Sequence, residues 1–151
     1  MLFRSCPDCG QILYNKDLEK NLSVCTKCAH HFRLSAEERL RTLLDEPEWT
    51  EHFGNLVSND PLRFTDTKPY RDRLKKAIEA TGRNDAIVVA TGHLEGLPVV
   101  IAAMEYAFIG GSMGVVMGEK ITRAIELAIE ERRGVIVVSC SGGARMMEGA
   151  L

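Results

Sequence analysis

Four cysteines near the start of this 151-residue chain constrain its fold more than any other feature. They form two Cys-x2-Cys pairs separated by 15 residues: Cys6, Cys9, Cys25 and Cys28. Each pair places two thiolates on a tight turn, and two such turns complete a closed tetrahedral zinc site. Because four thiolates leave no open position for water, the zinc is expected to be structural. We therefore predict a zinc ribbon over residues 1–33, with short strands at 11–14 and 21–24.

Disulfide bonds are the main alternative for these cysteines. The first six residues bring a charge and a cysteine before any apolar core, so they do not form a signal peptide. Since disulfides belong mainly to secreted proteins, zinc is the better interpretation. His30 and His31 are expected at the surface or behind the thiolates. Cys140 follows an apolar run and is expected to be a small buried strand residue.

The overall composition excludes several classes of protein. Apolar residues make up 45% of the chain and charged residues 26%, which is typical of a folded domain. The 19 basic and 21 acidic residues give a net charge of −2, so no global basic field indicates nucleic-acid binding. The longest apolar stretch, residues 96–104, is far shorter than the roughly 20 residues of a membrane span. A membrane partner is therefore not expected.

Residues 34–84 are predicted to form a helical connector. Ser35 and Glu38 have the spacing of a capping box, which begins a helix that ends at about residue 46. Residues 49–67 are polar and are expected to be irregular. A second helix is predicted over residues 70–80, and we interpret its basic outer face as a solvated one.

Residues 85–151 have the pattern of an α/β domain. Strands and helices alternate along this part of the chain: strands at 86–91 and 97–105, a helix at 116–131, a strand at 135–140, and a helix that starts within 141–145. This repeating ββα layout predicts helices packed on a sheet.

Two glycine-rich loops each follow a predicted strand and precede a predicted helix. At such a place backbone amides converge, and they stabilise a phosphate or an oxyanion that forms during a reaction. The first loop, residues 110–114, could bind a phosphate, line a thioester site or form a tight turn. The second loop, residues 141–145, has two consecutive glycines whose amides could hold a carbonyl oxygen as it becomes an enolate. Arg145 could pair with an acidic group or a phosphate, or tie down a neighbouring loop.

The first loop also matches the G-x-S-x-G pattern of a serine hydrolase, with Ser112 as the nucleophile. Such an enzyme needs a histidine later in the chain, and all four histidines precede Ser112. A nucleophilic Cys140 meets the same lack of a downstream histidine. The hydrolase interpretation is therefore disfavoured.

Five segments occur in an order that points to one family: "CPDCGQILY", "VCTKCAHHFRLSAEERL", "FTDTKPYRDRL", "EYAFIGGSMG" and "SGGARMMEGA". With them the whole chain resembles the β subunit of the bacterial and plastid acetyl-CoA carboxylase carboxyltransferase. The resemblance implies a crotonase-like fold, a superhelix of ββα units, of which residues 85–151 would be the first part. It also implies transfer of a carboxyl group from carboxybiotin to acetyl-CoA, which gives malonyl-CoA.

The resemblance implies a role for each matching position. Gly142, Gly143 and the amide of Ala144 would form an oxyanion hole for the thioester carbonyl. A second set would bind the acyl-CoA: Gly110, Gly111, Ser112, Met113, Gly114 and Arg145. The four ribbon cysteines would hold a structural Zn²⁺, and the biotin would be supplied on a separate carrier protein. Because the released biotin can take the α-proton, a side-chain base is unnecessary.

The resemblance further implies an α2β2 carboxyltransferase in the cytoplasm or the plastid stroma. The partners would be its α subunit, the biotin carboxyl carrier protein and biotin carboxylase, with ATP and nucleotide binding in the complex. Family chains are longer, so we expect the first half of a β subunit, inactive alone. Two alternatives stay open: a carboxyltransferase for another acyl group, and a nucleic-acid-binding ribbon, since residues 1–33 carry five Lys/Arg against three Asp/Glu.

Overall fold

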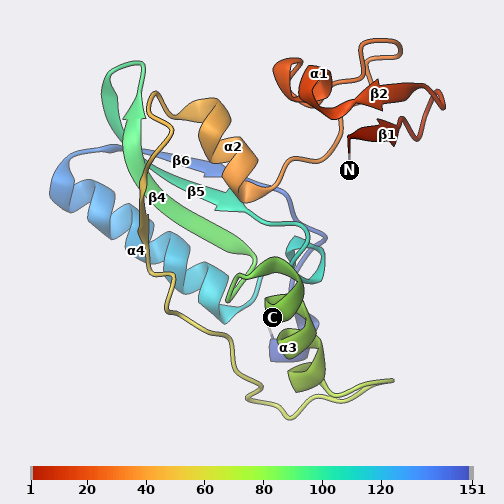
Figure 1. Cartoon of the computed structure of the whole chain (residues 1–151). Helices are drawn as coiled ribbons and strands as arrows, with labels where there is room; N and C mark the ends of the chain where they lie inside the picture. Colours follow the sequence, from red (N-terminus) through yellow and green to blue (C-terminus); the bar gives the residue numbers. More distant parts are fainter. Residues whose placement is uncertain (1, 150–151) are drawn as a thin grey trace. The chain divides into compact units, whose positions relative to one another are not determined.

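The computed structural model describes residues 2–149 and divides into two compact units, Met1–Leu34 and Ser35–Leu151 (Figure 1). Each unit has its own small hydrophobic core. Ala150 and Leu151, the last residues of the predicted 85–151 domain, lie outside the described part of the chain.

The first unit is built on a two-stranded sheet and one short helix. Strand β1, Phe3–Ser5, pairs antiparallel with β2, Ile12–Tyr14, and helix α1, Asn15–Lys20, follows at once. The predicted strand at 21–24 is wrong. Leu22 and Ser23 have φ values of 51° and 59°, which a strand does not allow, and of this segment Val24 alone forms a bridge, with His31. The core of this unit consists of Cys6, Leu13, Leu18 and Cys25.

The second unit contains a four-stranded sheet in the order β3-β4-β5-β6. Strands β4, Ile87–Leu94, and β5, Leu97–Met104, form a hairpin whose turn residues Glu95 and Gly96 have φ values of 50° and 76°. Two positive φ values in a two-residue turn match the right-handed twist of the strands. Strand β6, Gly134–Val138, lies parallel to β5 on the other side. The predicted α/β layout of two strands, a helix and a third strand is confirmed.

Strand β3, Thr50–His52, lies within the segment that was expected to be irregular. It pairs antiparallel with β4 at the edge of the sheet, where Glu51 is opposite Ala90. Three polar residues carry no apolar alternation, and their pairing depends on backbone hydrogen bonds to β4. The sequence pattern therefore gave no indication of this strand.

Helices cover both faces of the sheet (Figure 1). Helices α3, Tyr70–Thr81, and α4, Val115–Glu131, pack with one set of alternate strand residues, among them Ile87 and Val89. Helix α2, Ala36–Leu43, packs with the other set, and its capping box between Ser35 and Glu38 is present as predicted. Successive residues of β4 point to opposite faces of the sheet, and helices cover both faces. Residues 87–90 are therefore all buried.

The chain after β6 differs from the prediction. Strand β6 ends at Val138, so Cys140 lies beyond it and is half-buried. In place of an α-helix starting within 141–145, the described residues form an extended loop and the single 3-10 turn η2, Met146–Glu148. The loop stays extended because it pairs with the first glycine-rich loop, and Gly143 has a φ of 124° that a helix excludes. Within residues 2–149, no helix is long and apolar enough to cross a membrane.

Candidate functional site: two paired glycine-rich loops

The two glycine-rich loops lie side by side. The loop at 110–114 includes the 3-10 turn η1, Ile109–Gly111, and continues into the N-terminus of α4. The N–H of Met113 donates to the carbonyl of Gly143 at 2.9 Å, and the N–H of Arg145 donates to the carbonyl of Met113 at 2.8 Å. The N–H of Gly142 donates to the carbonyl of Gly110, also at 2.9 Å. The structure thus brings the two predicted sets of site residues together.

Two of the glycines are required by the packing of the protein on itself. A Cβ on Gly111 would lie 3.2 Å from the carbonyl carbon of Cys140 and closer still to its oxygen. A Cβ on Gly114 would lie 2.9 Å from Cδ of Glu148 and 3.0 Å from Nη1 of Arg145. These positions are glycine because the backbone of one loop approaches the other loop and a buried carboxylate.

Two other glycines face open space. A Cβ on Gly110 or Gly143 would meet no atom within 4 Å, although both residues have positive φ values, 65° and 124°. The sequence argument, that a missing Cβ lets a ligand approach the backbone, therefore fits Gly110 and Gly143 best.

The amides of the second loop differ in their availability. The N–H of Gly142 is used by the carbonyl of Gly110, and the N–H of Gly143 donates to Oγ of Ser141 at 3.0 Å. Ala144 is exposed, and its N–H has no hydrogen-bond partner among residues 2–149. The hydroxyl of the exposed Ser141 can rotate away from Gly143. A carbonyl oxygen could therefore accept from Ala144 and, after that rotation, from Gly143.

Arg145 points into the protein. Its side chain is fully buried, and its guanidinium binds both carboxylate oxygens of Asp85, with Nη1 at 2.7 Å from Oδ2 and Nη2 at 3.1 Å from Oδ1. Burial lowers the pKa of Arg145, but the hydrogen bonds and charge of Asp85 outweigh it and raise that pKa above its ordinary value. The guanidinium is also 5.4 Å from the ring centre of Phe108. Arg145 thus pairs with an acidic group and also ties down a neighbouring loop, so both roles considered from the sequence are present.

Ser112 is bound by the same guanidinium. Its carbonyl accepts from Nη2 of Arg145 at 2.7 Å and its Oγ from Nε at 3.1 Å. The hydroxyl thus has a partner inside the protein, whereas the neighbouring Met113 is 41% exposed. Of these two predicted acyl-CoA residues, Met113 has the side chain that a ligand can reach.

Glu148 is a buried carboxylate behind the loops. It accepts hydrogen bonds from the hydroxyls of Ser58 and Tyr70 and, at 2.7 Å, from the N–H of Val115 at the start of α4. Burial raises the pKa of Glu148, but the donors Ser58 and Tyr70 outweigh it and hold that pKa below its ordinary value. Burial raises the pKa of Tyr70 to about 12, so its hydroxyl keeps the proton that it donates.

No sequence pattern indicated a role for the partners of Arg145. Asp85 is 60 residues away in sequence and Tyr70 is 75 away. No periodic pattern links residues at such separations, because the fold alone brings them together. Their one sequence signal is local: an acidic residue, Asp85, directly before the apolar run of β4.

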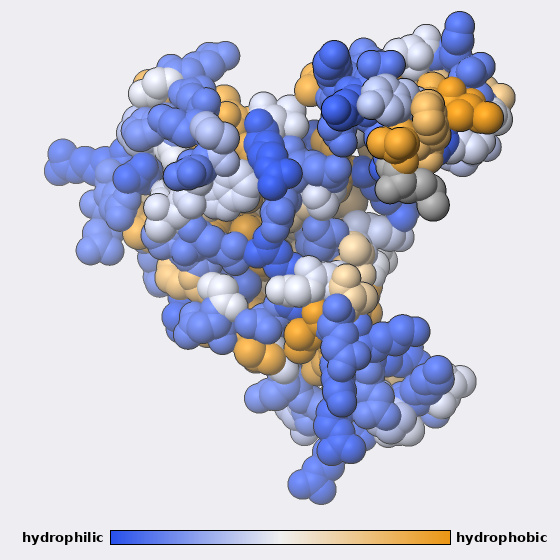
Figure 2. Space-filling model, in the orientation of Figure 1, coloured by the Kyte–Doolittle hydropathy of each residue, from blue (hydrophilic) through white to orange (hydrophobic). Residues whose placement is uncertain are grey.

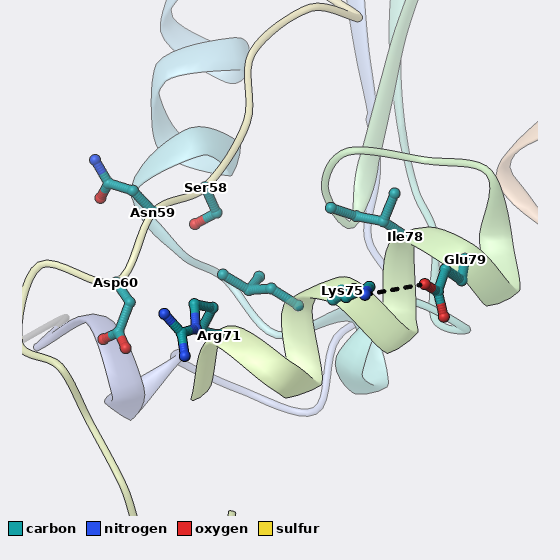
Figure 3. Close-up of a pocket in the computed structure, with 8 residues that line it drawn as sticks. Ser58, Asn59, Asp60, Arg71, Lys75, Ile78 and Glu79 are labelled. Carbon is teal, nitrogen blue, oxygen red and sulfur yellow. Dashed lines mark ion pairs between the residues drawn. The ribbon is translucent and has the colours of Figure 1, made fainter. Parts of the chain in front are cut away.

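A cavity of about 530 Å³ lies elsewhere in this unit, between the segment 58–60 and helix α3 (Figure 3). Its lining combines the apolar Leu74 and Ile78 with charged groups, including a Lys75–Glu79 ion pair at 4.0 Å. Neither glycine-rich loop lines it. The cavity and the paired loops are therefore separate features.

The four ribbon cysteines have the geometry of a zinc site. Their sulfur atoms all lie within 4.8 Å of one another: Sγ of Cys6 is 3.6 Å from that of Cys28, and Sγ of Cys9 is 3.8 Å from that of Cys25. A tetrahedral ion with Zn–S bonds of ~2.3 Å requires sulfur–sulfur distances of about 3.8 Å. The four cysteines therefore fit a tetrahedral Zn²⁺ site.

The backbone around the cysteines favours thiolates. The N–H of Lys27 donates to Sγ of Cys25 at 3.5 Å, and the N–H groups of Cys28 and Lys27 lower the pKa of Cys25 to about 6. His30 binds Asp8 through Nδ1 at 2.8 Å, and His31 is exposed. Both histidines are thus outside the ligand set, as expected from the sequence.

Comparison with known proteins agrees with both units. Residues 3–28 match the acetyl-CoA carboxylase zinc finger domain, and residues 56–151 match the carboxyl transferase domain. Because the second match covers more than half of its length, this chain belongs to the carboxyl transferase domain family. The predicted structural zinc ribbon is confirmed.

The relatives are more specific. The chain is 50% identical over 150 residues to the acetyl-coenzyme A carboxylase carboxyl transferase subunit beta of Citrifermentans bemidjiense, covering 99% of this chain and 53% of that protein. It is equally similar to the subunit of the same name from Synechococcus sp. strain RCC307, with 52% of that protein covered. The predicted family resemblance is confirmed, and the chain spans about half the length of these curated relatives.

A solved structure supports the fold. The transcarboxylase 12S structure with methylmalonyl-coenzyme A and methylmalonic acid bound matches with a TM-score of 0.60 and 25% identity. The match covers 78% of this chain and 21% of that one. The predicted carboxyltransferase architecture, of which this chain contains one part, is therefore confirmed.

Proposed function

We propose that the full protein carrying this sequence is the β component of an acetyl-CoA carboxylase carboxyltransferase. It would transfer a carboxyl group from carboxybiotin to the methyl carbon of acetyl-CoA and release malonyl-CoA. One observation supports this more than any other: the loops at 110–114 and 141–145 are paired, and they leave the exposed N–H of Ala144 without a partner among the described residues. The 50% identity to subunits of that name agrees with it.

The chemistry proposed for the loops is stabilisation of negative charge on an oxygen. The thioester carbonyl of acetyl-CoA would accept from the N–H of Ala144 and from that of Gly143. As a proton leaves the methyl group, the electron pair moves onto this oxygen, and fixed N–H dipoles stabilise the enolate more than the neutral carbonyl. The N–C bond of carboxybiotin would break to release CO2, the biotin nitrogen would take the α-proton, and the enolate carbon would attack the CO2 to form the C–C bond.

Carboxybiotin, brought by a separate carrier protein, would supply the carboxyl group and, once decarboxylated, the base that takes the α-proton. The carboxylates behind the loops are consistent with a base that comes from biotin and not from a side chain. Asp85 and Glu148 are buried and both bind Arg145, so neither is free to act as a base. The roles of Gly110, Gly111, Ser112, Met113 and Gly114 in lining the acyl-CoA site remain part of this proposal.

The partners proposed with this function are the α subunit of an α2β2 carboxyltransferase, the biotin carboxyl carrier protein and biotin carboxylase. ATP would be used by the complex, and the location would be the cytoplasm or the plastid stroma. These follow from the family resemblance and from the names of the relatives.

A reconstituted transfer assay tests the function. The full chain and its partner subunit are incubated with carboxylated carrier protein and acetyl-CoA, and malonyl-CoA is measured. Malonyl-CoA is the expected product. Carboxylation of a different acyl-CoA in preference to acetyl-CoA would favour the related carboxyltransferase, and transfer to no acyl-CoA would contradict the proposal.

Nucleic-acid binding by the ribbon is the second candidate. The ribbon carries exposed hydrophobic side chains (Figure 2), among them Phe3, whose ring lies 5.3 Å from that of Tyr14. The guanidinium of Arg4 lies 5.6 Å from the ring centre of Phe32. Aromatic rings next to basic groups can stack on bases. If the ribbon has this function, the affinity of the full chain for RNA or DNA must fall steeply with salt and must be lost with Phe3→Ala.

A further inference from the structure

A cluster of buried polar side chains lies directly behind the two glycine-rich loops. We call it the Arg145 network, and it has six members: Ser58, Tyr70, Asp85, Ser112, Arg145 and Glu148. Asp85 and Arg145 have no exposed surface, and Glu148 is 7% exposed. The network is thus part of the interior and offers no charged group to a ligand.

Arg145 joins the two loops through its side chain as well as its backbone. Its backbone pairs with Met113, while its guanidinium makes two hydrogen bonds to Ser112 and two to Asp85. Asp85 lies two residues before β4, which is an inner strand of the sheet. Arg145, which directly follows Ala144, therefore fixes the tip of the first loop both to the second loop and to the start of the sheet strand β4.

Glu148 fixes the other side of the first loop. It accepts from the N–H of Val115, and it can reach this first turn of α4 because Gly114 has no side chain. A carboxylate at a helix N-terminus is favourable because it accepts from unpaired N–H groups. Tyr70 and Ser58 hold the same carboxylate from α3 and from the segment before it.

A network of buried charges is an unfavourable choice if its role is to stabilise the fold. Three charged groups of the network are buried, because the guanidinium of Arg145 lies between the carboxylates of Asp85 and Glu148. Buried ion pairs contribute little net stability compared with apolar side chains of the same size, because each ion loses its hydration. Bidentate hydrogen bonds, however, fix the relative position of two segments in a way that apolar packing does not.

We propose that Arg145 and Glu148 are positioning residues, which hold the 110–114 and 141–145 loops in the register that presents the N–H of Ala144 to the thioester carbonyl. The inference rests on the proposed function. Arg145, assigned to the acyl-CoA from the sequence, acts here through the loops without touching the substrate. If its guanidinium or the Glu148 carboxylate is altered, the N–H should lose its alignment while the rest of the binding surface is retained.

The test uses the full chain, assembled with its partner subunit, and two ligands. One is acetyl-CoA, and the other is S-ethyl-CoA, a thioether with the same number of carbon atoms that lacks the carbonyl oxygen. The ratio of their dissociation constants measures the hydrogen bond to the carbonyl. Because partial unfolding raises both apparent dissociation constants by the same factor, a general loss of stability leaves this ratio unchanged.

The variants are Arg145→Lys and Glu148→Gln, with Arg123→Lys and Glu119→Gln as matched controls. Arg123 and Glu119 form an ion pair at 2.7 Å on the exposed face of α4. Wild type and controls are expected to bind acetyl-CoA about tenfold more tightly than the thioether, which corresponds to one well-placed hydrogen bond. In Arg145→Lys and Glu148→Gln the ratio should fall to about twofold, with malonyl-CoA turnover reduced by about tenfold or more.

Tyr70→Phe keeps the test decisive if the stronger variants do not fold. It removes one donor to Glu148 without leaving a cavity, and the ratio should fall by about two- to threefold. Variants that keep the wild-type ratio, with turnover lowered only in proportion to their folded fraction, would make the network purely structural and overturn the proposal. If the wild type binds both ligands equally, no hydrogen bond to the carbonyl contributes to binding, and this result would contradict the proposed function itself.

Discussion

Two glycines, one directly before helix α4 and one within it, are expected to respond in opposite directions to replacement by alanine. Gly118 is exposed within the helix, and a Cβ there would meet no atom within 4 Å. Alanine loses less conformational freedom than glycine on folding, so Gly118→Ala should stabilise the protein by about 0.5–1 kcal/mol. Gly114 precedes the helix, and there a Cβ would overlap Glu148.

The cost at Gly114 can be estimated from the contacts that must change. The Cβ would lie 2.9 Å from Cδ of Glu148, so this carboxylate must move and lose the 2.7 Å hydrogen bond from Val115. A hydrogen bond to a charged group is worth about 1.5–3 kcal/mol, and overpacking adds about 1–3 kcal/mol. Gly114→Ala should therefore destabilise the protein by about 3 kcal/mol or more.

Thermal unfolding of the full chain measures both changes. With about 2–4 °C per kcal/mol for a domain of this size class, Gly114→Ala should lower the midpoint by about 6–12 °C. Gly118→Ala should raise it by about 1–4 °C. A Gly114→Ala protein as stable as wild type would show that Glu148 is not held against the start of α4, and the Arg145 network would then be wrongly described.

Two further predictions concern the zinc ribbon and the pH dependence of stability. Cys9→Ser should reduce the zinc content from one ion per chain to near zero and make residues 2–34 sensitive to protease, while Cys140→Ser retains the zinc; metal analysis and limited proteolysis check this. Because the pKa of Glu148 in the folded protein lies below its ordinary value of 4.5, its stabilisation is complete above that pH and is lost as the pH falls through the folded value. The unfolding midpoint should therefore fall on acidification below about pH 4.5, and less steeply in Glu148→Gln than in wild type; equal slopes would contradict the assignment.

Local signals in the sequence predicted much of the fold. The capping box at Ser35 and Glu38, the helix at 70–80 and the two strands that correspond to β4 and β5 all depend on residues close in sequence, and all are present. The cysteine spacing predicted the ribbon because two tight turns need only face each other to bind zinc.

Pairings between distant segments could not be predicted in the same way. Strand β3 is polar and depends on the edge of β4, and β1 replaces the predicted strand at 21–24 as the partner of β2. The loops at 110–114 and 141–145 were identified from their glycines, but the reason differs between positions. Gly111 and Gly114 make room for the protein itself, and only a structure distinguishes them from glycines that face open space.

The central claim is that the two paired loops together bind the acyl thioester. Hydrogen–deuterium exchange of the full chain, assembled with its partner subunit, tests this with and without acetyl-CoA. The N–H groups of Gly143 and Ala144, and those of residues 110–114, should exchange more slowly when acetyl-CoA is bound. Unchanged exchange in both loops, with protection confined to the cavity between residues 58–60 and α3, would contradict the account.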